Sequence, residues 1–294
     1  MNTIASYLFL VVNWVFSFLP FSIIYLFSDF LYFIFFHVTG YRKKVIYENL
    51  INSFPEKSEN EINLIAKKYY KHMCDVIMET SKLRHTSFEQ LMKRNTIKNP
   101  ELLNSLFDKG KSVIAVMGHY GNWEVFGNLC SLIKHKPLVV YKPLTDKIMN
   151  DYLNKNRSKF GVGIVPMAET YKTMINYQKQ NILTLSVLIA DQAPTYGESH
   201  YWTTFLNQES AFFIGAEKIA QKTNQSVVYF HVDKIKRGYY DVEVILLYED
   251  SRNAAQFEII EKYIKTLESK IIKKPEYWLW SHRRWKRKRK NNEA

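Results

Sequence analysis

The chain has 294 residues, with 41 Lys and Arg against 28 Asp and Glu, so its formal net charge is +13. Hydrophobic residues make up 47% and charged residues 23%, which excludes a disordered, collagenous or wholly membrane-embedded protein. The two cysteines, Cys74 and Cys130, lie far apart in predicted helices. We therefore expect no disulfide framework and a reducing compartment that faces the cytosol.

The N-terminal segment is strongly apolar, and its only charged side chain from Met1 to Tyr41 is Asp29. Since about 20 apolar residues cross a bilayer core, residues 1–40 are predicted to form a membrane anchor. A cleaved signal peptide is the alternative, but no Lys or Arg precedes the apolar stretch, which is also too long and too aromatic. Pro20 either kinks one tilted helix or separates a spanning helix from an interfacial helix over Phe21–Val38.

Residues 41–294 follow as a single predicted domain. The basic cluster Arg42-Lys43-Lys44 directly after the apolar segment places this domain on the cytoplasmic side of the membrane. Ser58 and Glu61 have the spacing of a capping box, and apolar residues at helical intervals predict a long amphipathic helix over Glu59–Leu83.

Short apolar runs then alternate with helical segments. Strands are predicted at Ser112–Met117, Pro137–Tyr141, Ile182–Ala190, Ser226–Lys234 and Tyr239–Leu247, the last two joined near Arg237-Gly238. Helices are predicted at Trp123–Ile133, Met149–Phe160, Phe212–Thr223 and Ala254–Ile272. This alternation predicts an α/β fold, a sheet with helices on both faces.

A candidate catalytic group follows the run Ser112–Met117. Two glycines, Gly118 and Gly121, bracket His119 at a strand-to-helix turn, which would expose the imidazole at the carboxyl edge of the sheet. Glu124, five residues further on, would reach back to one imidazole nitrogen and orient a general base. The alternative is a structural histidine that caps a helix.

The segment Gly118–Glu124, with the sequence GHYGNWE, resembles the His-x4-Asp/Glu block of the lysophospholipid acyltransferase superfamily, and in particular its lipid A biosynthesis acyltransferase branch. Further segments resemble other blocks of this branch in the same order. They are Asn49-Leu50 with Phe54-Pro55, Val140–Pro143 with Arg157 and Gly161, Asp191-Gln192, and Pro275–Trp278 with Trp280–Lys286. The resemblance covers essentially the whole chain.

The resemblance implies a glycerol-3-phosphate acyltransferase-like fold with a mixed sheet. It also implies transfer of a fatty acyl chain from acyl carrier protein, or from acyl-CoA, to a hydroxyl of a membrane lipid in the bacterial inner membrane. His119 would be the general base, Glu124 would hold its neutral tautomer, and no cofactor, metal or enzyme nucleophile would be needed. Arg157 would stabilise an oxyanion or bind a lipid phosphate, and Asp191 would orient Arg157 or the acceptor.

A surface salt bridge is the alternative for Arg157 and Asp191. Substrate contacts are expected from residues of these blocks, namely Gly118, Asn122, Trp123, Lys142, Gln192, Arg283 and Arg284. The chain departs from the pattern of this branch at two places, and both lie where the acceptor pocket is expected. Lys142 stands where many members have Arg, and Phe205-Leu206-Asn207 where many have a Phe-Gly pair.

The C-terminal tail is basic, since seven of the nine residues His282–Lys290 are Lys or Arg, and Trp278, Trp280 and Trp285 lie beside them. Cations next to interfacial tryptophans suit anionic lipids of the inner leaflet and the acidic surface of acyl carrier protein. Nucleic-acid binding is the rival interpretation, but the anchor and the absence of a nucleic-acid-binding motif oppose it.

The sequence therefore predicts an acyltransferase that acts on a lipid A precursor. A lysophospholipid, an aminolipid or a glycolipid is the alternative acceptor. A non-catalytic adaptor at the membrane surface is the alternative class of protein.

Overall fold

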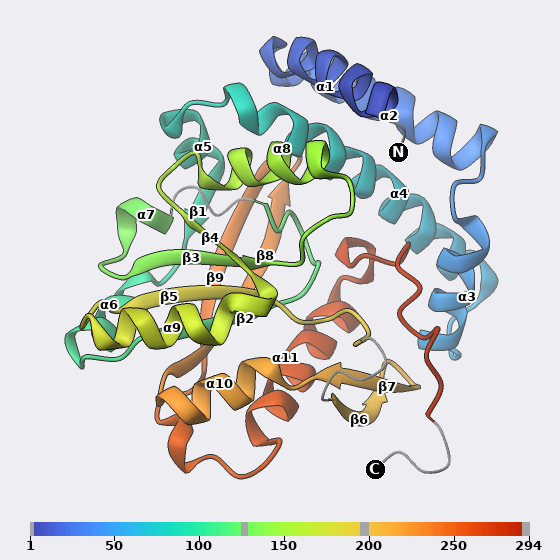
Figure 1. Ribbon diagram of the computed structural model, residues 1–294. Coiled ribbons are helices and arrows are strands. Elements are labelled where there is room, and N and C mark those ends of the chain that lie inside the picture. Colours follow the sequence, from blue (N-terminus) through green and yellow to red (C-terminus); the bar gives the residue numbers. More distant parts are fainter. Residues whose placement is uncertain (1–2, 125–128, 195–199, 290–294) are drawn as a thin grey trace.

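A seven-stranded mixed sheet forms the centre of the fold (Figure 1). The computed structural model describes residues 3–124, 129–194 and 200–289. The strand order is β1-β9-β8-β2-β5-β3-β4, and β6 and β7 form a separate antiparallel pair. The strands are β1 (Asn95–Ile97), β2 (Val113–Met117), β3 (Lys136–Tyr141), β4 (Gly163–Pro166), β5 (Thr184–Ile189), β6 (His200–Phe205), β7 (Gln208–Phe213), β8 (Ser226–Lys236) and β9 (Tyr239–Tyr248). The α/β class with a mixed sheet is confirmed.

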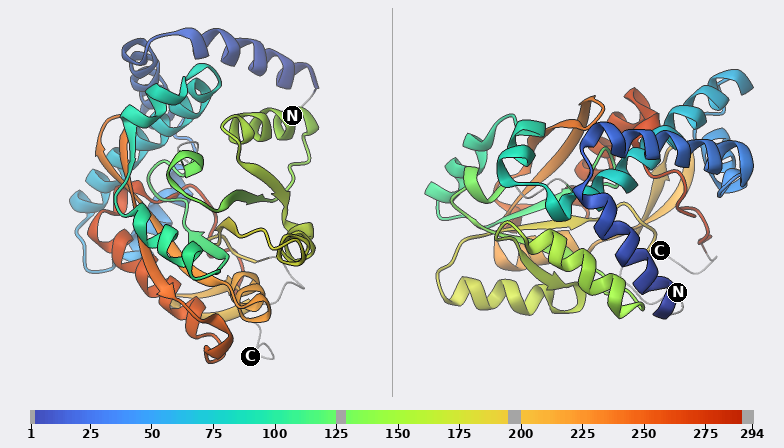
Figure 2. Two further views of the ribbon diagram at one scale, coloured as in Figure 1. Left: turned by 90° about the vertical axis from the view of Figure 1, so that its left-hand side faces the viewer. Right: turned by 90° about the horizontal axis from the view of Figure 1, so that it is seen from above.

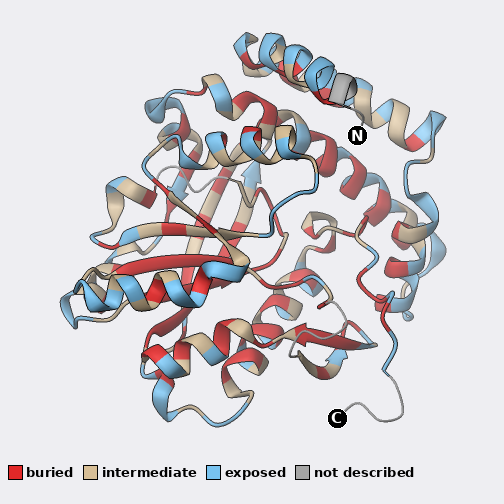
Figure 3. Cartoon of the chain, in the orientation of Figure 1, coloured by how far each residue is buried: buried red, intermediate tan, exposed pale blue. Residues whose placement is uncertain are grey.

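Helices cover both faces of the sheet. They are α1 (Thr3–Phe18), α2 (Phe21–Phe33), α3 (Lys43–Ser53), α4 (Glu59–Lys82), α5 (Phe88–Arg94), α6 (Pro100–Asp108), α7 (Leu129–Leu132), α8 (Lys147–Ser158), α9 (Thr170–Lys179), α10 (Gly215–Thr223) and α11 (Glu258–Lys273). Successive β2 side chains point to opposite faces, so Ile114 and Val116 join a core cluster with α4 and α11, whereas Val113 and Ala115 join a second cluster with α6. Figure 3 shows the resulting buried strands in red.

Most predicted elements are found, with shifted ends. The capping box is present, because Ser58 and Glu61 bond each other's backbone at the start of α4. Phe212 lies in strand β7 and not in the predicted helix, which begins only at Gly215. The helix predicted over residues 123–133 is described as α7 alone, and residues 125–128 lie outside the described part of the chain.

The N-terminal segment forms two helices that break at Pro20 and pack on the domain (Figure 2). Among the described residues, the helix with the length and composition needed to cross a bilayer is Phe21–Val38, in which a π-helical turn, Ile34–Val38, extends α2. One of the two alternatives from the sequence made Phe21–Val38 the interfacial helix, but the described apolar helix before Pro20 is the shorter one, Ser6–Phe18. Length and composition thus single out α2 with its π-helical turn, and in the structure both N-terminal helices pack on the domain.

Polar contacts join α2 to α4 and to the β8–β9 turn. The buried carboxylate of Asp75 on α4 accepts a hydrogen bond from Ser28 Oγ at 2.7 Å and pairs with Lys234 Nζ at 2.9 Å. Arg237 Nε donates to the same carboxylate at 2.8 Å, while its Nη2 pairs with Asp29 at 2.7 Å. The one acidic residue of the apolar segment thus faces the domain.

We expect Asp75→Ala to destabilise the fold by about 3–5 kcal/mol, because Lys234 would keep a buried charge without its partner. The free energy of unfolding, measured by urea denaturation in detergent micelles, checks this. Asp108→Ala is the matched control, since Asp108 pairs with Lys134 at 2.6 Å on the surface and should contribute less than about 1 kcal/mol. Equal losses for the two variants would contradict the prediction.

Candidate active site

The register of two parallel strands brings His119 and Asp191 together. Met117 at the end of β2 lies opposite Ile189 at the end of β5. Two residues beyond each strand end, His119 Nδ1 and Asp191 Oδ1 are 2.6 Å apart. The pair therefore occupies the carboxyl edge of the sheet, where parallel α/β folds place their ligands.

Asp191 is a buried carboxylate with three donors. Its side chain is 2% exposed. Oδ1 accepts from His119 Nδ1, and Oδ2 accepts from the His119 backbone N–H and from Trp278 Nε1, both at 2.8 Å. Burial alone would raise the pKa of Asp191, but the charge and hydrogen bonds of His119, together with the Trp278 bond, lower that pKa below its usual value. Asp191 thus stays ionised and fixes the imidazole.

This geometry sets the tautomer of His119. An ionised carboxylate only accepts hydrogen bonds, so Nδ1 carries the proton and Nε2 is the basic nitrogen of the neutral ring. Nε2 lies 3.4 Å from Gln192 Nε2, at the wall of a cavity. The His119 side chain is 17% exposed, and its ring packs edge-on against Trp123, with centroids 5.1 Å apart. His119 is therefore able to take a proton from a group bound in this cavity.

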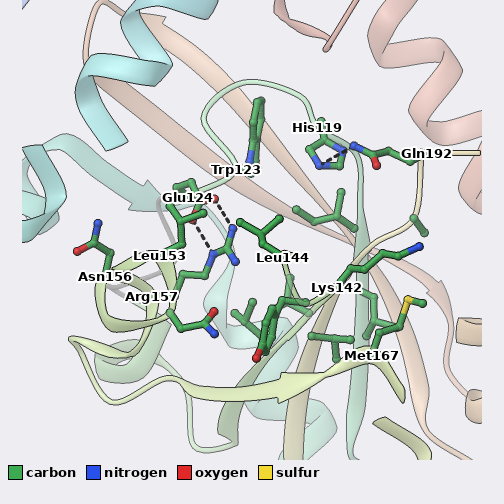
Figure 4. Close-up of a pocket in the computed structure, with 18 of the residues that line it drawn as sticks. His119, Trp123, Glu124, Lys142, Leu144, Leu153, Asn156, Arg157, Met167 and Gln192 are labelled. Atoms are coloured by element: carbon green, nitrogen blue, oxygen red, sulfur yellow. Dashed lines mark hydrogen bonds and ion pairs between the residues drawn. The ribbon is translucent and has the colours of Figure 1, made fainter. Parts of the chain in front are cut away.

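The prediction that Glu124 orients His119 is wrong. Glu124 instead forms a bidentate pair with Arg157 of α8, at 3.0 Å to Nε and 2.7 Å to Nη2 (Figure 4). Burial would lower the pKa of Arg157, but the bonds and charge of Glu124 raise it. Asp191 was expected to orient Arg157 or the acceptor. Strand register brings it to the imidazole instead, while Glu124 binds Arg157.

A buried network holds the turn that carries His119. Asn122 Nδ2 donates to Glu79 Oε2 of α4 at 2.8 Å, and Asn122 Oδ1 accepts the Glu124 backbone N–H. His72 Nε2 donates to the Gly121 carbonyl at 3.1 Å, and the Gly121 N–H donates to the Tyr277 carbonyl at 3.0 Å. Burial raises the pKa of Glu79. The turn is thus anchored on α4 and on the C-terminal segment.

Sequence reasoning missed several of these groups. Glu79 and His72 lie on the buried face of the predicted amphipathic helix. A charged or polar residue on such a face indicates a buried hydrogen-bond partner, and this signal could have identified both residues. Trp278 was recognised as part of a block but was expected at the membrane interface. Its bond to Asp191 joins residues 87 positions apart, a contact that no local pattern predicts.

The cavity beside His119 has a volume of about 360 Å³ and lies between the sheet edge and α8. Of the predicted residues, those in its wall are His119, Trp123, Glu124, Lys142, Arg157 and Gln192. Apolar side chains such as Leu83, Leu144, Phe160 and Met167 line much of the rest. The wall thus combines a base and cations with an apolar interior, which suits a substrate with a polar head and a hydrocarbon chain.

Four residues that were expected to contact substrate do not line the cavity beside His119: Gly118, Asn122, Arg283 and Arg284. Gly118 packs against α11, where an added Cβ would lie 2.8 Å from Leu267 Cδ1. Asn122 is buried on Glu79, as above. Arg284 is 2% exposed, donates to the Ala211 carbonyl at 2.6 Å and lies over the Phe212 ring, because the C-terminal segment is folded into the core. Arg283 is exposed.

The C-terminal tryptophans are also not interfacial. Trp278, Trp280 and Trp285 are buried in the main core cluster, and each indole N–H has a protein acceptor. Phe205-Leu206-Asn207 forms the β6–β7 turn, in which Asn207 Nδ2 donates to the Ser53 carbonyl of α3. It lines neither of the two described cavities. Within residues 3–124, 129–194 and 200–289, no group of His, Cys, Asp or Glu could hold a metal ion.

We expect Gly121→Ala to destabilise the protein by about 3 kcal/mol, since φ is +62° and the new Cβ would lie 2.4 Å from the Val232 carbonyl oxygen. Gly110→Ala is the matched control. Gly110 also has a positive φ, +72°, but nothing lies within 4 Å of its added Cβ, so about 1 kcal/mol is expected. Urea denaturation compares them, and equal effects would show that the close approach at Gly121 is unimportant.

Comparison with known proteins identifies the family of this chain. The family model for the bacterial lipid A biosynthesis acyltransferases matches residues 1–287. A search of the curated proteins gives no match. The match extends over nearly all of the chain, from the apolar helices to the C-terminal segment that binds Asp191. The chain belongs to the bacterial lipid A biosynthesis acyltransferase family.

Proposed function

We propose that this protein transfers an acyl chain from a thioester on acyl carrier protein to a hydroxyl of a lipid A precursor. The observation that carries the proposal is the pair of His119 and Asp191, in which His119 Nε2, next to the Gln192 amide, borders a cavity with an apolar interior. A hydroxyl is a poor nucleophile at neutral pH, so its attack on a thioester requires a base at this position.

In the proposed mechanism the acceptor hydroxyl gives its proton to His119 Nε2 as its oxygen bonds to the thioester carbonyl carbon. Asp191 stabilises the imidazolium that forms. When the tetrahedral intermediate collapses, the carbon–sulfur bond breaks and the leaving thiolate takes the proton from Nε2, which regenerates the neutral base. The reaction needs no metal or cofactor beyond the thioester co-substrate.

Arg157 and Gln192 are proposed to bind substrate oxygens. Glu124 occupies Nε and Nη2 of Arg157, which fixes the guanidinium in the cavity wall and leaves Nη1 for a phosphate or a developing oxyanion. The Gln192 amide is close to Nε2 of His119, where the reacting oxygens would meet. Lys142 adds a second positive charge to the cavity wall, on the side away from Arg157 (Figure 4).

The proposed binding partners, acyl carrier protein and anionic lipids, are inferred from the charge and position of exposed cations. Arg283, Lys286 and Lys288 are exposed and would face the acidic surface of acyl carrier protein or anionic lipids of the inner leaflet. The exposed cations Arg42, Lys43 and Lys44 follow the apolar helices, which supports a catalytic domain on the cytoplasmic side of the bacterial inner membrane. Acyl-CoA is the alternative donor.

The acceptor is tested in a strain that lacks this protein. We expect its lipid A to lose the mass of one acyl chain, wild-type protein to restore it, and His119→Ala to restore less than about 1% of it. Mass spectrometry of purified lipid A and of total lipids measures this. A shift in another lipid class would overturn the acceptor, and no shift in any lipid would favour the non-catalytic adaptor.

The partner of the base is tested with acceptor-free hydrolysis of the acyl thioester by the purified protein. Asp191→Asn should lower this His119-dependent rate by about 10²–10⁴-fold, because the amide no longer fixes the productive tautomer or stabilises the imidazolium. Glu124→Gln, the matched carboxylate change, should lower the hydrolysis less than Asp191→Asn does, since Glu124 holds Arg157 and does not contact the base. A greater loss for Glu124→Gln would contradict the assignment.

A further inference from the structure

A second cavity of about 440 Å³ lies on the far side of Trp123 and Glu124. Trp123, Glu124 and Leu153 line both cavities and form the wall between them. The second cavity is bounded by α1, α4, α8 and the C-terminal segment, through residues that include Phe9, Ile77, Thr80, Met149 and Leu279. Two apolar spaces therefore meet at the turn that carries His119.

Helix α1 forms the roof of the second cavity, and Figure 2 shows it running from α4 across to α8. Buried hydrogen bonds hold α1 in this position. Asn13 Nδ2 donates to Ser81 Oγ of α4 at 3.1 Å, and Tyr152 of α8 donates to Asn13 Oδ1 at 2.6 Å. Lys82 Nζ donates to the Ser17 carbonyl at 2.6 Å. The roof is thus part of the domain.

The polarity of α1 is the reverse of that of a helix on a water-facing surface. Its buried residues are polar: Ser6, Asn13 and Ser17. Its exposed residues are large and apolar: Tyr7, Leu8, Val11, Val12, Trp14, Val15 and Phe18 are 44–63% exposed. A contiguous apolar surface of this kind marks contact with an apolar phase, and the family acts on a membrane lipid, so the outer side of the roof fits hydrocarbon.

The lining of the second cavity continues this apolar surface. Phe9 of α1 and Ile77 of α4 both line the cavity and are 38% and 40% exposed. The cavity beside His119 carries the side chains of Lys142, Arg157 and Gln192, whereas the second cavity is lined mainly by aliphatic and aromatic groups. Glu124 is the charged residue of this lining, and it is neutralised by Arg157. A hydrocarbon chain can therefore pass from the membrane into the second cavity without meeting an unpaired charge.

We propose that the second cavity binds a hydrocarbon chain of the membrane-lipid acceptor, which enters beneath α1. This rests on the proposed function, because transfer to a lipid brings two hydrocarbon chains to one base. The donor chain then occupies the cavity beside His119, and the wall of Trp123 and Leu153 keeps the two chains apart. The acceptor is accordingly selected by a chain that it already carries.

Photocrosslinking tests the site without catalysis. The full-length protein, as wild type and as His119→Ala, is placed in phosphatidylglycerol vesicles containing a phospholipid with a diazirine near the end of one acyl chain. We expect crosslinks on Ile77, Thr80 or Met149 in both forms. Thr80→Trp should fill the cavity and lower these crosslinks at least tenfold. Val12→Trp, which adds the same side chain on the outer face of α1, should leave them unchanged.

Crosslinks confined to exposed residues of α1 and α2 would overturn the proposal, as would crosslinks in the cavity that Thr80→Trp leaves intact. Ile77→Trp, at a more exposed position of the lining, is the second blocking variant if Thr80→Trp lowers the free energy of unfolding. Because His119→Ala is included, a chain site that fails is distinguished from a transfer reaction that fails.

Kinetic measurements then show whether the second cavity binds the hydrocarbon chain of the acceptor or that of the donor. Thr80→Trp should raise KM for the lipid acceptor at least tenfold, with acceptor-free thioester hydrolysis within twofold of wild type. Hydrolysis that falls together with transfer would mean that the second cavity holds the donor chain, and would overturn the assignment to the acceptor. Val12→Trp should change neither quantity.

Discussion

The buried carboxylate of Asp191 is the group on which the rest of the site depends. A buried ionised carboxylate is costly unless several donors compensate it. Here the donors come from the end of β2, through the backbone and ring of His119, and from the C-terminal segment, through Trp278. The same bonds that keep Asp191 charged therefore join three distant parts of the chain and set the tautomer of the base.

The sequence predicted the parts of the fold that depend on local patterns. The capping box and the helical spacing predicted α4, and apolar runs predicted β2, β5 and the β8–β9 hairpin. The β6–β7 hairpin was not predicted. Its turn residues Leu206 and Asn207 both have positive φ, and Leu is not a usual turn signal; tertiary contacts override the local preference, since Leu206 is buried.

The site was predicted in its residue types but not in its pairings. Spacing along the chain favoured the nearest carboxylate, Glu124, as the partner of His119. The true partner is set by the parallel register of β2 and β5, a non-local property that no local spacing contains. The buried positions of Trp278 and Arg284 were missed for a similar reason, because composition predicts a basic, aromatic tail but not where the tail packs.

The exchange of partners gives Glu124 a different physical role. It lies with Trp123 and Leu153 in the wall between two cavities whose interiors are largely apolar, where an unpaired charge would be strongly destabilising. The bidentate bond to Arg157 neutralises both groups and ties the turn after β2 to α8. Asn122 secures the same turn to α4 through Glu79. The wall is therefore bonded to α8 on one side and to α4 on the other, and these bonds hold the turn that carries His119 between the two cavities.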